Sequence, residues 1–202
     1  MQKFTKHTGK TVAMFQPNID TDQILPKQFL KRITKSGYGD FLFYDWRFDE
    51  NGKPNKDFIL NQPRFRDASI FLAGKNFGGG SSREYAPWGL ADFGFRVIIA
   101  PSFGEIFCNN CFKIGLLPTI LNEKIVAELV EKTETIENYS LTINLEKLEI
   151  FDAQNFCINF EIDEFRRECL LNGWDDIGLI LKHEAKISEF ERQRPHWSLS
   201  II

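Results

Sequence analysis

Residues 69–88 of the chain read SIFLAGKNFGGGSSREYAPW. The first five residues of this stretch are an apolar run typical of a buried β-strand, and a second such run lies at residues 96–100. The turn between the two runs contains Gly78, Gly79 and Gly80 in succession. Because glycine has no Cβ, the backbone can adopt positive φ angles here and can approach a ligand closely. The stretch therefore predicts a strand, a ligand-binding turn, a short helix and a return to the sheet.

A helix start is expected directly after the glycines. Ser81 occupies an N-cap position and Glu84 follows three residues later, which is the pattern of a capping box. The first turn of such a helix has free backbone N–H groups and a partial positive charge, and both favour an anion. Ser81 and Ser82 add two hydroxyls and Arg83 adds a guanidinium. The turn is therefore predicted to bind an anion.

The composition is that of one folded domain. The chain has 202 residues, of which 43% are hydrophobic and 14% aromatic, enough for a packed core. The net charge is −3 and no basic cluster with interleaved aromatic residues is present, so a nucleic-acid partner is not expected. The first residues lead into no apolar signal segment, and no apolar run has the length of a membrane span. We expect a cytoplasmic protein with no membrane partner, a single domain over residues 1–202, and a mobile tail from about residue 194.

Strand and helix patterns alternate beyond the opening stretch. Strands are predicted at residues 10–15, 69–73, 96–100 and 115–121, with a helix at residues 104–113. One strand bent at its middle is predicted at residues 140–151, and another strand at 156–162. Helices are predicted after the caps Asn122, Asp163 and Asp175, the last continuing to Pro195. This order predicts an α/β fold with a partly parallel central sheet flanked by helices.

Two carboxylates, Asp20 and Asp22, lie in a short segment between Pro17 and Pro26. In an extended segment, side chains at i and i+2 lie on the same side. Such a pair could bind Mg²⁺, or one carboxylate could act in acid–base chemistry while the other caps a turn. The spacing alone favours the simpler interpretation, in which both are turn and cap residues.

The cysteines and histidines do not predict a metal site. Cys108 and Cys111 form a C-x-x-C pair that could be a redox centre or half of a metal site. They lie in the middle of a predicted helix, so ordinary buried or half-buried thiols are the favoured interpretation. Cys157, Cys169 and three scattered histidines supply no further ligands at short range. We therefore expect no metal on this chain.

Common nucleotide and hydrolase motifs are absent from the opening stretch. No Gly-Lys-Ser or Gly-Lys-Thr closes the turn as in a P-loop, and neither G-x-G-x-x-G nor G-x-S-x-G is present. Ser81 has no histidine near it in the sequence, so a serine hydrolase is a weak alternative.

Three segments together resemble one family. Residues 76–88 (NFGGGSSREYAPW) are similar to the signature of the aconitase-type swivel domain, residues 18–26 (NIDTDQILP) resemble its second hallmark, and residues 100–118 continue the pattern. The length and residues 163–173 resemble the small subunits of bacterial 3-isopropylmalate dehydratase within that family. The resemblance covers nearly the whole chain and implies an aconitase-type swivelling β/β/α domain.

The resemblance also implies a reaction and a partner. A separate large subunit would hold a [4Fe–4S] cluster whose open iron binds the hydroxyl and a carboxylate of a small hydroxy-diacid substrate. Dehydration of 2-isopropylmalate and rehydration with opposite regiochemistry would give 3-isopropylmalate, a step in leucine biosynthesis. No cofactor is then expected on this chain, and the isolated chain is expected to be inactive.

The matching positions of the motif imply roles for single residues. Ser81 would be the base that removes the proton next to a substrate carboxylate, and Arg83 would bind a carboxylate. Ser82 would add a hydrogen bond, and Asp22 would line the site as an orienting or charge-balancing group. The resemblance implies a supporting turn formed by Asn76, Gly78 and Gly80.

A serine base requires strong stabilisation of its alkoxide. Each pKa unit corresponds to about 1.4 kcal/mol, whereas a helix terminus supplies about 0.3–2 kcal/mol. Backbone N–H donors in a dry site supply about 3–4 kcal/mol each, and Arg83 adds its charge. Closure against a partner would exclude water from the turn, so the turn is expected to need a second subunit.

Two positions depart from the family pattern. Tyr85 stands where the family usually has histidine, and Gly79 stands where it often has cysteine. Tyrosine can donate a hydrogen bond but carries no charge near neutral pH.

Other substrates and another class of function stay open. Related enzymes of the family act on citraconate, dimethylmalate or homoaconitate, and a pocket for the isopropyl group is expected in the segment from Leu25 to Leu30. A different class is a non-catalytic anion- or nucleotide-binding module that uses the glycine turn. Co-purification of a brown, cluster-bearing partner would favour the dehydratase, and tight nucleotide retention by the chain alone would favour the module.

Overall fold

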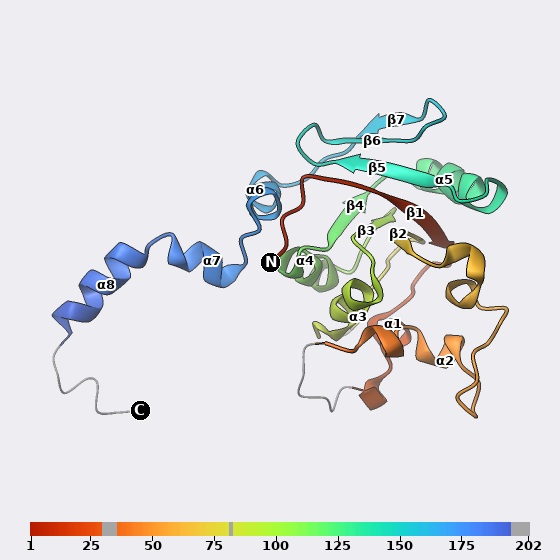
Figure 1. Cartoon of the computed structure of the whole chain (residues 1–202), viewed down its shortest axis with the longest axis horizontal. Helices are drawn as coiled ribbons and strands as arrows, with labels where there is room; N and C mark the ends of the chain where they lie inside the picture. The colour runs from red at the N-terminus through yellow and green to blue at the C-terminus, as the bar shows by residue number, and fades with distance from the viewer. Residues whose placement is uncertain (30–35, 81–82, 195–202) are drawn as a thin grey trace.

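A computed structural model of the chain describes residues 1–29, 36–80 and 83–194 (Figure 1). The strands are β1 (Lys6–Met14), β2 (Ala68–Ala73), β3 (Val97–Ala100), β4 (Leu117–Ile120), β5 (Ser140–Asn144), β6 (Glu149–Phe151) and β7 (Cys157–Asn159). The α-helices are α1 (Thr21–Ile24), α2 (Tyr44–Arg47), α3 (Tyr85–Phe93), α4 (Glu105–Ile114), α5 (Glu123–Thr135), α6 (Glu164–Asn172), α7 (Asp176–Leu181) and α8 (Glu184–Gln193). Short 3₁₀ turns lie at Lys27–Phe29, Gly39–Phe41, Ile59–Asn61 and Pro63–Phe65.

Over the described residues the strands form one mixed sheet in the order β4-β3-β2-β1-β5-β6-β7. Strands β1 to β4 are parallel, whereas β5, β6 and β7 continue the sheet from β1 in antiparallel pairs. Helices α3 and α4 make the crossover connections that the parallel neighbours β2, β3 and β4 require. The predicted α/β fold with a partly parallel sheet flanked by helices is confirmed.

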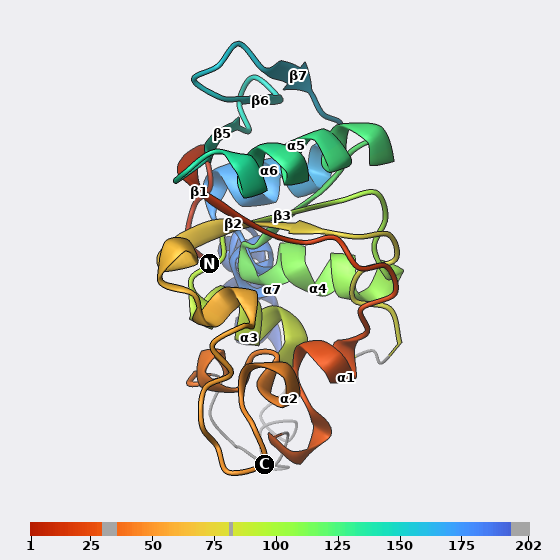
Figure 2. The same ribbon diagram turned by 90° about the vertical axis from the view of Figure 1, so that its right-hand side faces the viewer.

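Both faces of the parallel half of the sheet are buried. Along β2, Phe71 and Ala73 pack into one core with residues of α3 and α4, while Ile70 and Leu72 pack into another with residues of α5 and α6. Side chains alternate along a strand, so a strand covered on both faces has the continuous apolar sequence seen here. Figure 2 shows α5 and α6 on one side of the sheet and α3 and α4 on the other.

Local capping patterns predict two helices correctly. The side chain of Asn122 accepts from the backbone N–H of Lys124 at the start of α5, and that of Asp163 accepts from Arg166 at the start of α6. Helix α6 ends at Gly173, whose φ of 73° lies in the left-handed region that favours glycine.

Two other element predictions are wrong. Residues 140–151 are two strands, β5 and β6, joined by a turn in which Leu148 has a φ of 58°. The turn folds β6 back against β5, where the two strands pair antiparallel. The helix expected after Asp175 does begin there, where the Asp175 side chain accepts from Gly178 N at 2.8 Å, but it ends at Leu181, and a second helix, α8, follows after residues 182–183.

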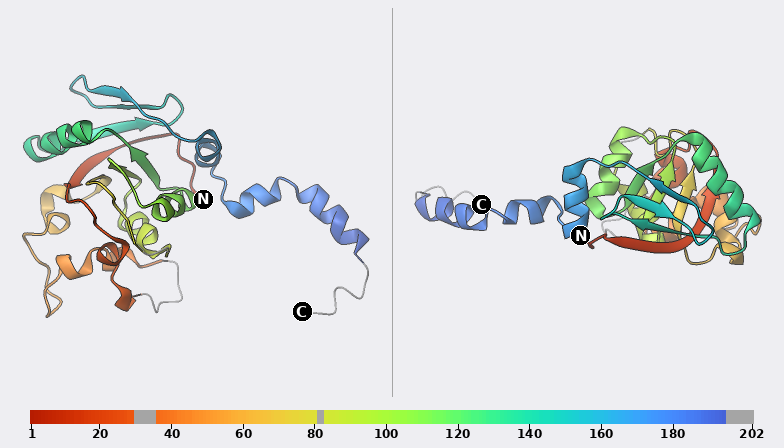
Figure 3. Two further views of the ribbon diagram at one scale, coloured as in Figure 1. Left: turned by 180° about the vertical axis from the view of Figure 1, so that it is seen from behind. Right: turned by 90° about the horizontal axis from the view of Figure 1, so that it is seen from above.

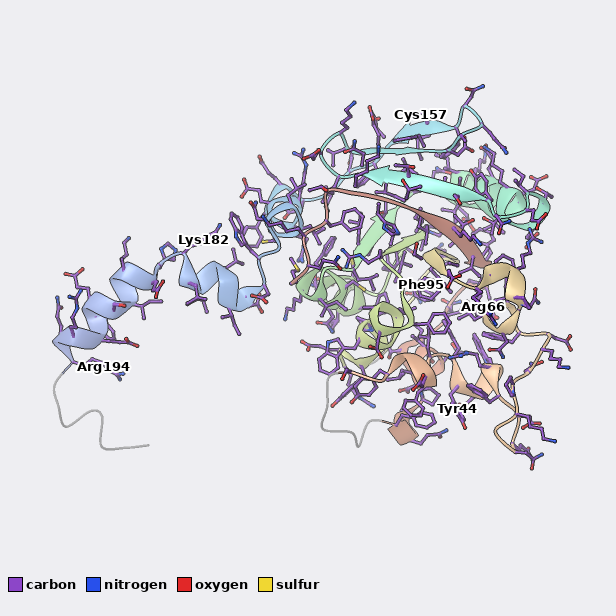
Figure 4. All side chains as sticks on the ribbon, in the orientation of Figure 1. Tyr44, Arg66, Phe95, Cys157, Lys182 and Arg194 are labelled. Atoms are coloured by element: carbon purple, nitrogen blue, oxygen red, sulfur yellow. The ribbon has the colours of Figure 1, made fainter. Side chains whose placement is uncertain are left out.

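Helices α7 and α8 form an arm that extends away from the sheet (Figures 1 and 3). The apolar side chains of the arm that are more than half exposed are Ile177, Ile180, Leu181 and Phe190. Figure 4 shows the arm, with Lys182 and Arg194 labelled, well apart from the side chains of the sheet. The mobile tail predicted from about residue 194 lies almost wholly at residues 195–202, outside the described residues. No helix within the described ranges combines the length and apolar character needed to cross a membrane.

Candidate active site

Three loops meet at the carboxyl ends of the parallel strands β1, β2 and β3. The loop after β2 contains the glycine turn and lies between the other two. Three backbone hydrogen bonds, of 2.7 to 3.0 Å, join residues 75–79 to residues 18–21 on one side. On the other side, Phe77 N donates to the carbonyl of Ser102 at 3.1 Å, and Gly104 N donates to the carbonyl of Phe77 at 2.9 Å. The carboxyl edge of a parallel sheet is a frequent ligand site in α/β proteins.

Polar side chains reinforce the contact between these loops. The Nδ2 amide of Asn76 donates to Oδ1 of Asn18 at 2.9 Å, and the backbone N–H of Asn76 donates to Oγ of Ser102 at 2.9 Å. Neither Asn18 nor Ser102 is among the site residues predicted from the sequence. Their place inside the family motifs at residues 18–26 and 100–118 is the only signal that could have identified them.

Glycines allow this close packing. A Cβ on Gly78 would collide with the ring of Phe107, and the φ of Gly78 is 72°. A Cβ on Gly104 would lie 2.6 Å from the carbonyl oxygen of Gly78. Gly80 has a φ of 99°, which side-chain-bearing residues rarely adopt. The sequence of the turn is therefore set largely by backbone geometry.

Asp20 and Asp22 have different surroundings. Asp20 caps α1, because its Oδ1 accepts from Gln23 N at 2.7 Å while Gln23 Oε1 accepts from Asp20 N at 2.8 Å. Asp22 lies in the first turn of α1 and forms an ion pair with Lys27 at 2.9 Å. The cap interpretation is confirmed for Asp20. The extended arrangement with both carboxylates on one side is wrong, because α1 begins between them.

Ser81 and Ser82 lie outside the described residues, so their assigned roles stay predictions. Arg83 is exposed, and within the part of the chain that the structure describes it has no hydrogen-bond or ion-pair partner.

Helix α3 begins at Tyr85, not directly after Ser81. Its N-cap is Glu84, whose side chain makes no capping hydrogen bond. Pro87 accounts for the difference. In a helix starting at Ser82 it would be an interior residue, where proline lacks the required N–H and clashes with the preceding turn. In the observed helix it lies in the first turn, where proline is tolerated. The predicted capping box is wrong for this helix.

The two departures from the family pattern fit their surroundings. Tyr85 is half-buried, with its ring centroid 5.3 Å from that of Tyr38 and 5.1 Å from that of Trp88 in an edge-on contact. A Cβ on Gly79 would lie 3.3 Å from the side-chain amide of Asn76, a contact that a small shift of Asn76 would relieve.

The C-x-x-C pair lies within α4, as predicted. Cys111 is buried and Cys108 is half-buried, and neither forms a disulfide. Burial raises the pKa of the Cys108 thiol, and it raises the pKa of Cys111 well above its usual value. Across residues 1–29, 36–80 and 83–194, no three His, Cys, Asp or Glu side chains gather closely enough to hold a metal ion.

The segment expected to hold a substrate pocket is partly packed against the protein, and its residues Lys27 and Gln28 are exposed. Leu25 and Pro26 are buried, and the ring of Phe29 stacks on that of Phe41 at 4.2 Å. Leu30 lies outside the described residues.

Comparison with known proteins identifies the family. Residues 1–124 match the Aconitase C-terminal domain, and residues 176–198 match the C-terminal domain of the 3-isopropylmalate dehydratase small subunit. The chain is 52% identical, over 194 residues, to the 3-isopropylmalate dehydratase small subunit of Brevibacillus brevis, which covers 96% of this chain and 100% of the relative. The chain belongs to the 3-isopropylmalate dehydratase small-subunit family. The small subunit of Geobacillus kaustophilus is 53% identical over 193 residues, covering 96% of this chain and 98% of that family member.

A solved structure agrees with this membership. The crystal structure of 3-isopropylmalate dehydratase from Methanocaldococcus jannaschii matches with a TM-score of 0.65 and 26% identity, covering 91% of this chain and 98% of that chain. The aconitase-type fold implied by the sequence resemblance is confirmed.

Proposed function

We propose that this chain acts as the small subunit of a cytoplasmic two-subunit hydro-lyase that interconverts 2-isopropylmalate and 3-isopropylmalate in leucine biosynthesis. The proposal rests mainly on one observation, the 52% identity over nearly the full length to relatives named 3-isopropylmalate dehydratase small subunit. The partly exposed glycine turn at the ends of β1, β2 and β3 supports it, because this edge of the sheet is open to contact with a larger partner.

In this proposal Ser81 removes a proton from the carbon next to a substrate carboxylate, and Arg83 binds a carboxylate. Ser82 adds a hydrogen bond to the substrate, while Asp22 orients it or balances its charge. Arg83 is exposed and has no hydrogen-bond or ion-pair partner among the described residues. This supports its role in binding a carboxylate, because guanidinium groups bind carboxylates through two parallel hydrogen bonds.

Stabilising the alkoxide of Ser81 requires donors close to its oxygen. Ser81 is four residues before Tyr85, the first residue of α3, and the dipole of a helix acts mainly within its first turn. Backbone N–H groups of the glycine turn and the guanidinium of Arg83 must then supply most of the stabilisation, at about 3–4 kcal/mol per well-placed donor in a dry site. Gly80 and Arg83 are exposed in this chain, so a large subunit is needed to exclude water.

The proposal assigns a [4Fe–4S] cluster to the large subunit. The thiols of this chain do not suit a cluster, because Cys108 and Cys111 are one helical turn apart with raised pKa values, and Cys157 lies on the outer strand β7 (Figure 4). The residues of this chain therefore take no part in holding the cluster. Their part is to bind the substrate carboxylate, to hold the proton at Ser81 Oγ and to exclude water.

Reconstitution with candidate large subunits tests the proposal. We expect formation of the enoic diacid only when both subunits are present, and fastest with 2-isopropylmalate among the hydroxy diacids of the family. Ser81→Ala should lower kcat about 10²–10⁴-fold, the usual contribution of a general base, and the neighbouring variant Ser82→Ala should lower it less.

Turnover by this chain alone would contradict the need for a partner. If a hydroxy diacid related to citraconate, dimethylmalate or homoaconitate is turned over faster than 2-isopropylmalate, that compound is the substrate instead. Tight nucleotide binding by the chain, without turnover with any large subunit, would favour a binding module instead.

A further inference from the structure

We propose that Asn18 and Ser102 are positioning residues. Each accepts a hydrogen bond from Asn76, and together these bonds hold the glycine turn in place for catalysis. This inference rests on the proposed function, in which Ser81 and Arg83 act from the end of that turn. The three side chains Asn18, Asn76 and Ser102 are called the polar clamp below.

Each member of the polar clamp follows a different parallel strand. Asn18 follows β1, Asn76 follows β2 and Ser102 follows β3. The side chain of Asn76 donates to Asn18 and its backbone N–H donates to Ser102, both at 2.9 Å. Asn76, at the start of the turn, is thus hydrogen-bonded to both neighbouring loops. The clamp therefore fixes the direction in which the chain leaves β2.

Two members of the polar clamp have a left-handed backbone. Asn18 has a φ of 60° and Asn76 a φ of 57°, a region that asparagine adopts more readily than most other side-chain-bearing residues. The carbonyl of Lys75 accepts from the backbone N–H of Asn18, so the segments that contain these two residues are also joined through their backbones.

The polar clamp becomes stronger when a partner closes over it. Asn18 and Asn76 are exposed in this chain, where water competes for their hydrogen bonds. Exclusion of water lowers the local dielectric and strengthens the same bonds. Misplacement of a reacting group by about 1 Å can lower a rate about 10²-fold. Loss of the clamp should therefore lower kcat more than it raises KM, since a small displacement of the base slows proton transfer steeply, whereas the long side chain of Arg83 can still reach a carboxylate.

Three variants separate the hydrogen bond from the backbone conformation. Asn18→Gly keeps the left-handed φ but removes the acceptor, whereas Asn18→Asp keeps an acceptor at Oδ1. Ser102→Ala removes the acceptor of the Asn76 N–H. The matched control is Asn155→Gly, since Asn155 is also exposed with a φ of 68° but lies in the β6–β7 turn.

The variants are compared in the reconstituted two-subunit enzyme with 2-isopropylmalate as substrate. Asn18→Gly and Ser102→Ala should each lower kcat about tenfold or more, with KM changed less than about threefold. Asn18→Asp and Asn155→Gly should stay within about threefold of the unmodified enzyme. If Asn18→Gly keeps full kcat, or if Asn155→Gly loses as much, the inference is overturned.

Amide hydrogen exchange of this chain distinguishes failure of the inference from failure of the proposed function. Exchange at Asn76, Phe77 and Gly78 should become at least about tenfold faster in Asn18→Gly and unchanged in Asn155→Gly. If no large subunit gives turnover, the proposed function fails while exchange still decides whether the polar clamp orders the turn. If the unmodified pair turns over but exchange and kcat are both unchanged in Asn18→Gly, only the clamp fails.

Discussion

The carboxylate of Asp22 lies 2.9 Å from the ammonium group of Lys27, and both side chains are partly exposed to solvent. The neighbouring Asp20 already caps α1. Of the two carboxylates in this motif, only Asp22 can therefore turn toward a substrate without breaking the helix start. An exposed ion pair of this kind contributes about 0–1 kcal/mol to stability, so Lys27 holds Asp22 only weakly.

Asp22→Ala tests whether this carboxylate serves the substrate. We expect kcat/KM of the reconstituted enzyme to fall roughly 10- to 100-fold, as for loss of a hydrogen bond to a charged group, while the free energy of unfolding changes by less than about 1 kcal/mol. Lys27→Ala removes only the ion pair and should leave kcat/KM within about threefold. Equal losses in the two variants would show that Asp22 acts through Lys27 alone.

Alanine substitutions at the adjacent residues Gly78 and Gly79 should lower the free energy of unfolding by very different amounts. Gly78→Ala places a Cβ into the ring of Phe107 at a φ of 72°, so we expect a loss of about 2–4 kcal/mol from overpacking and left-handed strain. Gly79→Ala meets only the amide end of the Asn76 side chain and should cost less than about 1 kcal/mol. Urea unfolding of the chain measures both, and similar losses would contradict the packing described for the turn.

Helix and strand positions that depend on local chemistry can be predicted from the sequence. Asn122 and Asp163 cap α5 and α6 because their side chains accept from nearby backbone N–H groups, and no distant residue is needed. The predicted start of α3 is wrong although its signal is also local. Pro87 excludes a helix from Ser82, and this steric limit outweighs the capping pattern at Ser81.

The convergence of the three loops cannot be read from local patterns. Asn18, Asn76 and Ser102 are far apart in the sequence and meet only because β1, β2 and β3 are parallel neighbours. Strand order depends on long-range pairing, which the periodicity of one strand does not encode. The family motifs point to the same segments, but they give no partner for Asn18 or Ser102.

Replacing Tyr85 by the residue usual in the family should have a modest effect. Tyr85 is the first residue of α3, and its ring packs against Tyr38 and Trp88. Because the proposed base and guanidinium are unchanged, kcat of Tyr85→His should stay within about tenfold, or ~1.4 kcal/mol. Tyr85→Phe isolates the hydroxyl. A gain much larger than tenfold would show that tyrosine limits the natural enzyme.

A histidine at the other end of the sheet should make stability depend on pH. Nε2 of His7 lies 2.8 Å from Oγ of Ser69. Burial, together with the charge of Arg96, lowers the pKa of His7 below its ordinary value. The unfolded chain therefore binds a proton at a higher pH than the folded chain, so the free energy of unfolding is greatest above about pH 6.5 and falls as the pH drops toward the folded pKa.

His7→Gln removes the titrating group while keeping polar atoms that can bond to Ser69. Between pH 7.5 and pH 5.5, about one unit on either side of the ordinary histidine pKa, the unmodified chain should lose more stability in urea unfolding than His7→Gln does. Ser69→Ala, which removes the hydrogen-bond partner of His7 and keeps the titrating group, is the matched control and should still lose stability over this range as the unmodified chain does. Equal losses in all three proteins would show that His7 does not contribute, since the linkage relation requires a titrating group whose pKa changes on folding.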